Sequence, residues 1–478
     1  IYKQICIIVA TDKTQKIADY SIKNQMIKAY FLPQIQSVKE IQNIGKQDLS
    51  YPKLSPIQIA EISDHLIAAQ KTTSDISIFE IVRCIALASA QWRDTNHPLR
   101  QKAENILPAV CGLSKKMVSQ VLDDVFKELT EEKLLELLEA ELGDAKILDR
   151  FCKRQNGNTR TRAFGPNLIT QILPGNVLGI SIISLVCGLL VKSANLLRVN
   201  QSEIVLTTLF AESLQDISPE IATTIAILIW NKQDELLTKT AFQKTDLVIA
   251  YGSDESITAI QTLIPPNTPR IFHGHKLSFG LIARENISKN LANKVAIDIA
   301  RYDQQGCLSP HLYYVESGGA NTPIHFAKQV AASLQKLSLA LPKGASDAQT
   351  SSQIQQLRGT LPLKGGSVFE SPDGTDWTVL FEPSQIFTPS PLSRCIWIKP
   401  VADLSEIPPL LASVQKVIQA IGIAVPKNRA DDIIEKISKI GGCRICPIGE
   451  MQRPPLNWMH DGQKRLVPLL RFVDWESQ

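Results

Sequence analysis

The stretch Leu168-Ile169-Thr170-Gln171-Ile172-Leu173-Pro174-Gly175-Asn176 begins an alternation of apolar runs and turn signals that continues through most of the chain. Its first six residues are mostly aliphatic or β-branched, which favours a strand, and the Pro-Gly-Asn that follows is a turn signal. The apolar segment 177–191 then predicts a buried helix, because it is shorter than the ~20 residues that a membrane span needs. Strand, turn and helix in this order predict a parallel sheet with crossover helices.

The same alternation continues toward the C-terminus. Further strands are expected at 195–199, 247–251, 270–272, 311–316, 377–382 and 394–399. Helices are expected between them at 202–215, 219–231, 255–263, 287–301, 323–339 and 407–420. Segment 341–352 is rich in serine, glycine and alanine and is expected to have little regular structure. The pattern predicts an α/β protein with a doubly wound sheet.

Residues 55–150 form a region of different texture. Ser55 can cap a helix, Pro56 is tolerated in its first turn, and apolar residues then recur at helical spacing. Further helices are expected at 76–92, 98–108, 114–128 and 131–142. This N-terminal region is therefore predicted to be largely helical, preceded by a short strand at 5–9.

Composition narrows the class of protein. The net charge of +4 over 478 residues is too weak and too scattered to indicate a nucleic-acid partner. Nine dispersed cysteines fit a reducing compartment, so we expect a cytoplasmic protein without disulfides or transmembrane segment. Cys443 and Cys446 form a lone CxxC without a second pair, and no metal site is expected. The N-terminal apolar run is short and lacks a cleavage signal, which argues against a signal peptide.

Cys307 is the candidate for chemistry. It lies in Arg301-Tyr302-Asp303-Gln304-Gln305-Gly306-Cys307-Leu308-Ser309-Pro310, where Gly306 and Pro310 require the backbone to turn. A loop can expose the sulfur, and nearby backbone N–H groups can stabilise its thiolate. The alternative is a loop cysteine without chemistry. Neither GxGxxG nor GxxxxGK[ST] occurs at a strand end, so a classical dinucleotide fingerprint and a P-loop are both absent.

Four strings, taken together and in order, carry a family resemblance. They are Leu173-Pro174-Gly175-Asn176, Phe272-His273-Gly274-His275-Lys276-Leu277-Ser278-Phe279, the run 303–310, and Trp458-Met459-His460-Asp461-Gly462. The chain resembles the aldehyde dehydrogenase superfamily and, more closely, the LuxC-like acyl-thioester reductases, the fatty-acid reductase component of bacterial luminescence. The resemblance implies a helical N-terminal region at 1–150, an NADP-binding α/β domain at 151–265, a catalytic α/β domain at 266–445, and a C-terminal segment at 446–478. It also implies a small oligomerisation element.

The resemblance assigns catalytic roles. Cys307 matches the nucleophile that forms an acyl-enzyme, and Asn176 matches the asparagine whose amide completes the oxyanion hole. Without the family, Pro-Gly-Asn is only an ordinary turn. His273 and His275 flank one turn, where a histidine can donate a proton or merely shape the backbone. His275 is our candidate acid. For Lys276, a catalytic role and a structural role agree equally well with the sequence.

Cofactor residues follow from the same resemblance. Arg198 matches a basic residue near the adenosine ribose, and Gln201 stands close to a glutamate that NAD-preferring members carry, so NADPH is favoured over NADH. Gly252 and Ser253 match the turn that meets the pyrophosphate at a helix N-terminus. Phe387 matches an aromatic residue near the nicotinamide ribose, although Gln385 replaces the usual glutamate two residues before it.

Phe272 is an informative departure from the family of hydrolytic aldehyde dehydrogenases. Those enzymes have a glutamate there as the base that activates water, and here the residue is an apolar aromatic. The substitution indicates reduction of a thioester, and it predicts that Phe272→Glu raises hydrolysis relative to reduction.

The sequence therefore predicts NADPH-dependent reduction of a long-chain fatty acyl thioester, from CoA or an acylated protein, to the aldehyde. The alternatives are a short-chain CoA-acylating aldehyde dehydrogenase and a non-catalytic acyl-binding scaffold. The resemblance also implies a homodimer or homotetramer and an acyl-activating partner enzyme.

Overall fold

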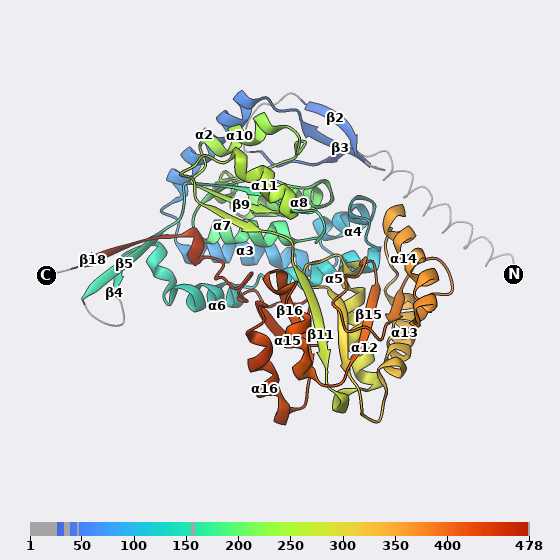
Figure 1. The fold of residues 1–478 in the computed structure, drawn as a ribbon. Coiled ribbons are helices and arrows are strands. Elements are labelled where there is room, and N and C mark those ends of the chain that lie inside the picture. Colours follow the sequence, from blue (N-terminus) through green and yellow to red (C-terminus); the bar gives the residue numbers. More distant parts are fainter. Residues whose placement is uncertain (1–25, 33–38, 45–46, 154–157, 477–478) are drawn as a thin grey trace, which may run out of the picture.

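The computed structural model describes residues 26–32, 39–44, 47–153 and 158–476. The strand expected at 5–9 lies outside these residues. Within them the chain forms two large sheets with their helices, a helical N-terminal part, and two small sheets (Figure 1). None of the helices in the described ranges is long and apolar enough to cross a membrane.

The first large sheet has five parallel strands in the order β10-β9-β6-β7-β8. The strands are β6 (Leu168–Ile172), β7 (Ala194–Arg198), β8 (Ile225–Leu228), β9 (Leu247–Tyr251) and β10 (Arg270–His273). The helices between them are α7 (Ile180–Leu190), α8 (Gln201–Ile217), α9 (Pro219–Ala222), α10 (Glu235–Gln243) and α11 (Asp254–Leu263). The chain leaves β6 toward β7 on one side and later returns to β9 on the other. This reversal of strand order creates a crevice at the carboxyl ends of β6 and β9.

The second large sheet has the order β13-β14-β15-β12-β11-β16-β17, parallel except for the β13–β14 pair. Its strands are β11 (Leu277–Ile282), β12 (Pro310–Glu316), β13 (Ser367–Glu370), β14 (Thr378–Phe381), β15 (Cys395–Val401), β16 (Ile418–Ala424) and β17 (Arg444–Pro447). Its helices are α12 (Lys289–Ala300), α13 (Pro323–Ala340), α14 (Ala348–Thr360), α15 (Ile407–Leu410) and α16 (Lys427–Ser438). Every residue of β12, between β11 and β15, is buried, as a central parallel strand requires.

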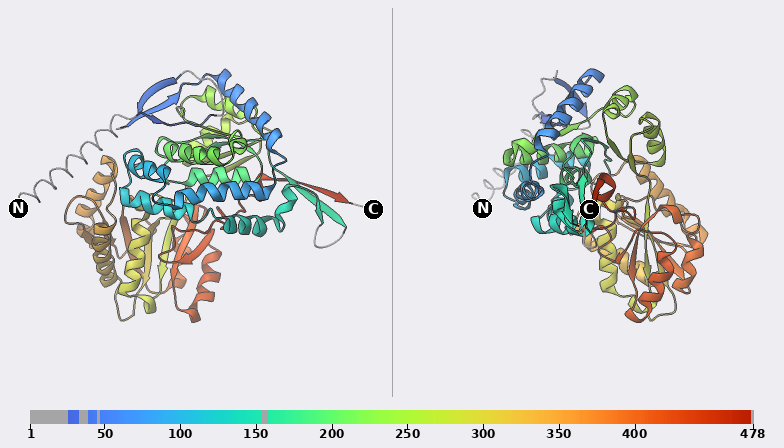
Figure 2. Two further views of the ribbon diagram at one scale, coloured as in Figure 1. Left: turned by 180° about the vertical axis from the view of Figure 1, so that it is seen from behind. Right: turned by 90° about the vertical axis from the view of Figure 1, so that its left-hand side faces the viewer.

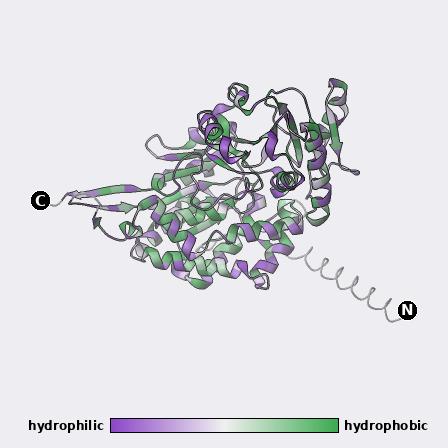
Figure 3. Ribbon diagram, turned by 90° about the horizontal axis from the view of Figure 1, so that it is seen from below, coloured by the Kyte–Doolittle hydropathy of each residue, from purple (hydrophilic) through white to green (hydrophobic). Residues whose placement is uncertain are grey.

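The N-terminal helices cover the first sheet. They are α2 (Pro56–Thr73), α3 (Ile78–Arg93), α4 (Pro98–Cys111), α5 (Lys115–Phe126) and α6 (Glu131–Leu142). Helices α3 to α6 share a core with α7 and α8, whereas the apolar face of α2 packs with α10 against the other face of the sheet. Hydrophobic and hydrophilic residues alternate along the outer helices, as expected when one helix face meets the core (Figure 3).

Two small sheets complete the fold. One contains β1 (Ile27–Lys28), β3 (Gln47–Pro52) and β2 (Lys39–Ile44). The other is an antiparallel arm of β18 (Arg471–Glu476), β5 (Thr159–Phe164) and β4 (Cys152–Lys153), which projects from the body (Figures 1 and 2). The arm thus joins the C-terminal end of the described chain to the segment that leads into β6.

Three expectations about secondary structure were wrong. The helix expected at 219–231 ends at Ala222, and β8 follows, because a short apolar run fits a buried strand as well as a helix. The helix expected at 407–420 stops at Leu410, and its end belongs to β16. The expected irregular segment 341–352 contains the start of α14, whose first turn is capped by Asp347.

Candidate active site

A cavity of about 750 Å³ lies at the carboxyl ends of β6, β9 and β10 and extends to the loop before β12. The residues that line it include five of the sequence candidates, Cys307, Asn176, Gly252, Ser253 and His275. Its far wall is formed by α5, the start of α6 and the segment 450–461. Ligands of open α/β sheets bind at this edge, outside the carboxyl ends of the strands.

The loop that carries Cys307 has an uncommon backbone. Tyr302, Asp303 and Gln304 all have positive φ, at 51°, 48° and 63°. The left-handed conformation costs roughly 1–2 kcal/mol for each residue with a side chain, so surrounding contacts must hold it. The carboxylate of Asp303 pairs with the buried guanidinium of Arg394 at 2.7 Å, and the Gln304 amide donates to the Cys395 carbonyl at 2.9 Å. The loop is therefore fixed from the second sheet.

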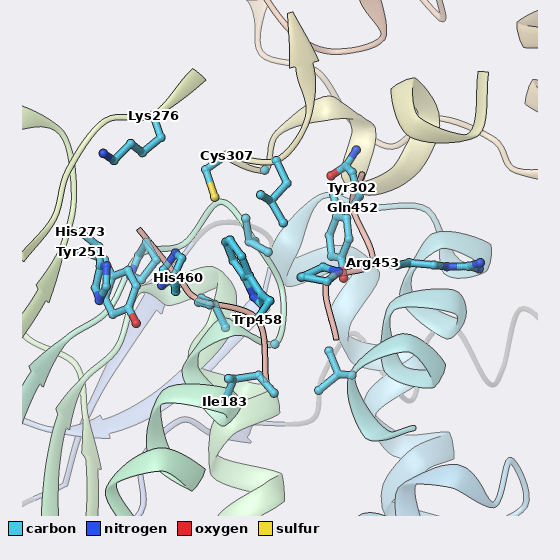
Figure 4. A pocket seen from close by; sticks show the side chains of 18 of the residues that line it. Ile183, Tyr251, His273, Lys276, Tyr302, Cys307, Gln452, Arg453, Trp458 and His460 are labelled. Atoms are coloured by element: carbon cyan, nitrogen blue, oxygen red, sulfur yellow. The ribbon is translucent and has the colours of Figure 1, made fainter. Parts of the chain in front are cut away.

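Cys307 is a half-buried thiol on the cavity wall, and its sulfur points into the cavity (Figure 4). The hydroxyl of Ser278 donates to its carbonyl at 2.7 Å and so anchors the loop to β11. Burial raises the pKa of the Cys307 thiol to about 11, and the charge of Asp461 adds to this rise. The thiol therefore needs a deprotonating partner to serve as a nucleophile at neutral pH.

Asn176 reaches toward the cysteine loop. Its side-chain amide donates to the carbonyl of Gln305 at 3.0 Å, which leaves its second N–H available. The turn before it is held by α8, because the Ser202 hydroxyl donates to the Gly175 carbonyl at 2.5 Å. A Cβ at Gly175 would lie 2.4 Å from the Asn200 side chain, so this close approach requires glycine. The structure thus brings Asn176 and Cys307 to one cavity.

Glu203 of α8 supports the segment that follows Asn176, at the start of α7. Its carboxylate accepts hydrogen bonds from the backbone N–H groups of Gly179, at 2.8 Å, and Ser181, at 3.4 Å, at the start of α7. The side chain is fully buried, and burial raises the pKa of Glu203 to about 8. The N-terminus of α7 therefore rests on a carboxyl group that α8 supplies.

Two histidines and a carboxylate line the same cavity as Cys307. The rings of Tyr251 and His273 stack at 4.3 Å between centroids, and those of His273 and His460 at 4.4 Å (Figure 4). The Nδ1 atom of His273 lies 2.5 Å from an Asp461 carboxylate oxygen. Burial, followed by the neighbouring His273, lowers the pKa of His460 to about 3, so this ring is neutral. The bond to His273 holds the pKa of Asp461 at about 2 despite burial, so its carboxyl is ionised.

The cofactor candidates divide into two groups. Gly252 and Ser253 line the cavity, and the Ser253 hydroxyl caps α11 by accepting from the Ser256 N–H at 3.3 Å. Arg198 ends β7, where its guanidinium donates to the Trp230 carbonyl, and Gln201 is the first residue of α8. Neither lines the cavity, although both lie at the same sheet edge. Phe387 is buried against Phe279 and also lies outside the cavity lining.

Phe272 does not face Cys307. It packs against the apolar cluster on the α2 and α10 side of the first sheet, while its neighbour His273 lines the cavity. Successive residues of a strand point to opposite faces of the sheet, so Phe272 and His273 lie on opposite sides. The expectation that a glutamate at position 272 would act on the acyl-enzyme is therefore corrected, since His273 occupies the cavity side.

His460 and Asp461 lie in the string Trp458-Met459-His460-Asp461-Gly462, but nothing in the sequence marks either residue as functional. Both line the cavity, and Asp461 has a positive φ of 53°. A positive φ in a non-glycine residue often marks a functional position, but sequence alone does not display it.

Comparison with known proteins places the chain in a family. The family model described as acyl-CoA reductase (LuxC) matches residues 73–473. The long-chain acyl-protein thioester reductase of Aliivibrio fischeri is 23% identical over 447 residues, which cover 92% of this chain and 91% of that protein. The enzyme of the same name from Photorhabdus luminescens is 22% identical over 452 residues, covering 93% and 90%.

Solved structures agree on the fold. Aldehyde dehydrogenase 21 from Physcomitrella patens superposes with a TM-score of 0.74 at 12% identity, covering 94% of this chain and 98% of that one. NADP-dependent glyceraldehyde-3-phosphate dehydrogenase from Bacillus halodurans C-125 gives 0.72 at 14%, covering 95% and 100%. The resemblance and fold class inferred from the sequence are confirmed. The chain belongs to the acyl-CoA reductase (LuxC) family and is an oxidoreductase built on the aldehyde dehydrogenase fold.

Proposed function

We propose that this protein reduces a long-chain fatty acyl thioester to the aldehyde with NADPH, through an acyl group held on Cys307. The observation that carries the proposal is that Cys307 and Asn176 open on the same cavity as the Gly252–Ser253 turn. The proposed nucleophile, oxyanion donor and cofactor turn all line this cavity. The curated relatives are named as long-chain acyl-protein thioester reductases, which supports the substrate class.

The chain's residues fit a nicotinamide dinucleotide. Gly252 leaves the sheet edge open at the N-terminus of α11, where backbone N–H groups favour phosphate. The first turn of α11 carries two carboxylates: Asp254, one of whose oxygens accepts from the His275 N–H at 3.2 Å, and Glu255, which is exposed to solvent. Arg198 supplies a cation at the end of β7 for a 2′-phosphate, and Gln201 adds no opposing charge. Bound at this edge, NADPH supplies the hydride.

Part of the cavity wall suits an acyl chain. This part includes Ile180 and Ile183 of α7, and Leu456 and Trp458 of the segment 450–461. Aliphatic and aromatic side chains favour transfer of methylene groups from water, at about 0.8 kcal/mol for each buried CH₂. Chain-length preference should therefore be set along this wall.

Each proposed step is assigned to residues of this chain. The thiolate of Cys307 attacks the thioester carbonyl, and the amide of Asn176 with the Cys307 backbone N–H stabilises the oxyanion. The carrier leaves as a thiolate, with an unperturbed pKa of roughly 8.5, and His275 at the cavity rim is the candidate proton donor. Phe387 remains a candidate contact to the nicotinamide ribose.

Partners follow from the same proposal. The acyl donor is CoA or an acylated protein, and an acyl-activating enzyme is the proposed supplier. The projecting arm exposes Phe472 and Trp475, with 40% and 49% of their surfaces accessible. Large exposed aromatic residues favour an interface, so we propose a homodimer or homotetramer joined through this arm.

An NADPH-consumption assay across acyl-CoA chain lengths, with the aldehyde trapped and identified, tests the function. We expect long-chain substrates to be preferred and Arg198→Met to raise the KM for NADPH more than that for NADH. A preference for short chains would favour the short-chain alternative. NADPH fluorescence that does not respond to the protein would favour a scaffold and contradict the proposal.

A further inference from the structure

The proposed steps leave one question open, namely what makes Cys307 a thiolate. A half-buried thiol with a pKa of about 11 is almost entirely protonated at neutral pH. Lys276 lowers this pKa, but burial and the charge of Asp461 outweigh it. The negative charge of Asp461 therefore disfavours the thiolate form of Cys307, unless a neighbouring group accepts the proton and offsets this charge.

His273 has the carboxylate partner that such an acceptor needs. Its Nδ1 lies 2.5 Å from the Asp461 carboxylate, which is ionised, so this nitrogen carries the proton and donates it. In the neutral form of the ring, the opposite nitrogen, Nε2, carries the lone pair, as in a histidine oriented by a carboxylate beside a nucleophile. Stacking against Tyr251 and His460 fixes the ring plane. His273 and Cys307 open on the same cavity (Figure 4).

We propose that His273, oriented by Asp461, is the base that takes the proton from the Sγ atom of Cys307, directly or through one water molecule. The inference rests on the proposed function and adds a residue pair to it. The S–H bond breaks and an N–H bond forms on Nε2, which leaves a thiolate beside an imidazolium. The imidazolium also neutralises the charge of Asp461, so the carboxylate no longer opposes the thiolate.

The proton balance of the reaction closes. The carrier thiolate takes one proton from solvent, through His275, when it leaves. Hydride transfer to the acyl carbon and collapse of the resulting thiohemiacetal return Cys307 as a thiolate, again beside the His273 imidazolium. One acyl thioester, one NADPH and one proton thus give one aldehyde, one carrier thiol and NADP⁺.

A metal site at the same side chains is disfavoured by the geometry. The nitrogen and oxygen atoms of His273, His460 and Asp461 lie within 4.8 Å of one another. The two rings, however, are stacked with an angle of 19° between their planes. Imidazole lone pairs lie in the ring plane, so nearly parallel stacked rings cannot both direct one at an ion about 2.1 Å away.

The pH dependence of Cys307 reactivity tests this pair. The titratable or charged groups that line this cavity around His273 are Asp461, His460, Tyr251, Lys276, His275, Arg465 and Cys307. We would measure alkylation of Cys307 by iodoacetamide from about pH 5.5 to about pH 9.5 by peptide mass spectrometry. Cys307→Ser gives the background from other thiols, and His325→Asn, an exposed histidine on α13, is the matched control.

The wild-type enzyme should alkylate with an apparent pKa at or below the unperturbed thiol value of roughly 8.5. His273→Asn and His273→Gln should slow alkylation about tenfold or more near neutral pH and raise that apparent pKa. Asp461→Asn is the sharper variant, because asparagine tolerates the positive φ at this position. Loss of a negative charge alone would speed thiolate formation, whereas loss of the oriented base slows it.

Slower alkylation in both the His273 and the Asp461 variants supports the pair. Unchanged reactivity in a folded His273 variant, or faster alkylation in Asp461→Asn, overturns it. Alkylation requires neither acyl donor nor NADPH, so the outcome is separate from the proposed function. If alkylation depends on the pair while no acyl-enzyme forms, the proposed function fails and the base assignment stands.

Discussion

At the scale of single residues, Asn176 is the side chain that we propose as the donor to the oxyanion. One N–H of its amide is engaged by the Gln305 carbonyl, and the other is available at the cavity. Asn176→Ala should lower the rate of acyl-enzyme formation about 10²- to 10³-fold, the usual cost of one oxyanion donor. NADPH binding, measured by fluorescence, should be unaltered. A variant with wild-type acylation would remove Asn176 from the mechanism.

The sequence comparison noticed that Phe272 replaces a glutamate, but it did not predict that the side chain points away from the cavity. Because its ring packs away from the cavity, Phe272→Glu should leave the ratio of aldehyde to free acid unchanged. It should instead lower the free energy of unfolding by about 1–3 kcal/mol, through a carboxylate placed against an apolar cluster. Product analysis together with urea denaturation checks both parts. An increase in free acid would restore the original expectation.

The turn signals around Cys307 made it a candidate from the sequence, whereas Asn176 became a candidate only through the family resemblance. The sequence could not supply the pairing of His273 with Asp461, since the two are separated by 188 positions and meet only in the folded chain.

At the scale of elements, the cysteine loop depends on a buried ion pair. Arg394 and Asp303 are almost fully buried, and the pair holds a backbone with three consecutive positive φ values. Arg394→Met should lower the free energy of unfolding by about 3–5 kcal/mol, because it leaves a buried carboxylate unpaired. Lys436→Met, which breaks the exposed pair with Asp432, should cost about 1 kcal/mol or less. Equal costs for the two variants would show that the loop does not depend on Arg394.

The turn beneath Asn176 should give the enzyme a pH-dependent stability. The pKa of Glu203 is raised from its ordinary value near 4.5 to about 8, so the folded chain holds this proton more tightly than the unfolded chain. Its stabilising contribution is therefore present below about pH 4.5 and is lost as the pH rises toward about 8. Thermal unfolding should show this loss in the wild type and a smaller one in Glu203→Gln.

Glu220→Gln, an exposed substitution on α9, serves as the control and should leave the pH profile as in the wild type. A Glu203→Gln variant with the full wild-type pH dependence would assign the effect to another group.

The elements that sequence misassigned show where local pattern fails. The runs that form β8 and β16 are short, apolar and flanked by helix-compatible residues, so periodicity does not separate strand from helix. Pairing with neighbouring strands decides their structure. β8 forms the edge of the first sheet, and β16 lies between β11 and β17 in the second.

At the scale of the whole molecule, the site exists because several distant segments converge. Strand ends of the first sheet bring Asn176 and Gly252, the second sheet fixes the loop of Cys307, and the segment 450–461 closes the far wall. The family and the α/β class could be predicted from ordered strings, whereas the shape of the cavity could not, because it depends on how the two sheets and the N-terminal helices pack.

We propose above that Cys307 carries the acyl group between thioester and hydride. The most direct measurement is mass spectrometry of the protein after incubation with a long-chain acyl-CoA without NADPH, followed by addition of NADPH. We predict one acyl group on the peptide that contains Cys307, its discharge as aldehyde when NADPH is added, and no label in Cys307→Ala. Cys443→Ala, a cysteine outside the cavity lining, should label normally. Aldehyde formation by Cys307→Ala, or an acyl group on another residue that discharges with NADPH, would contradict the account.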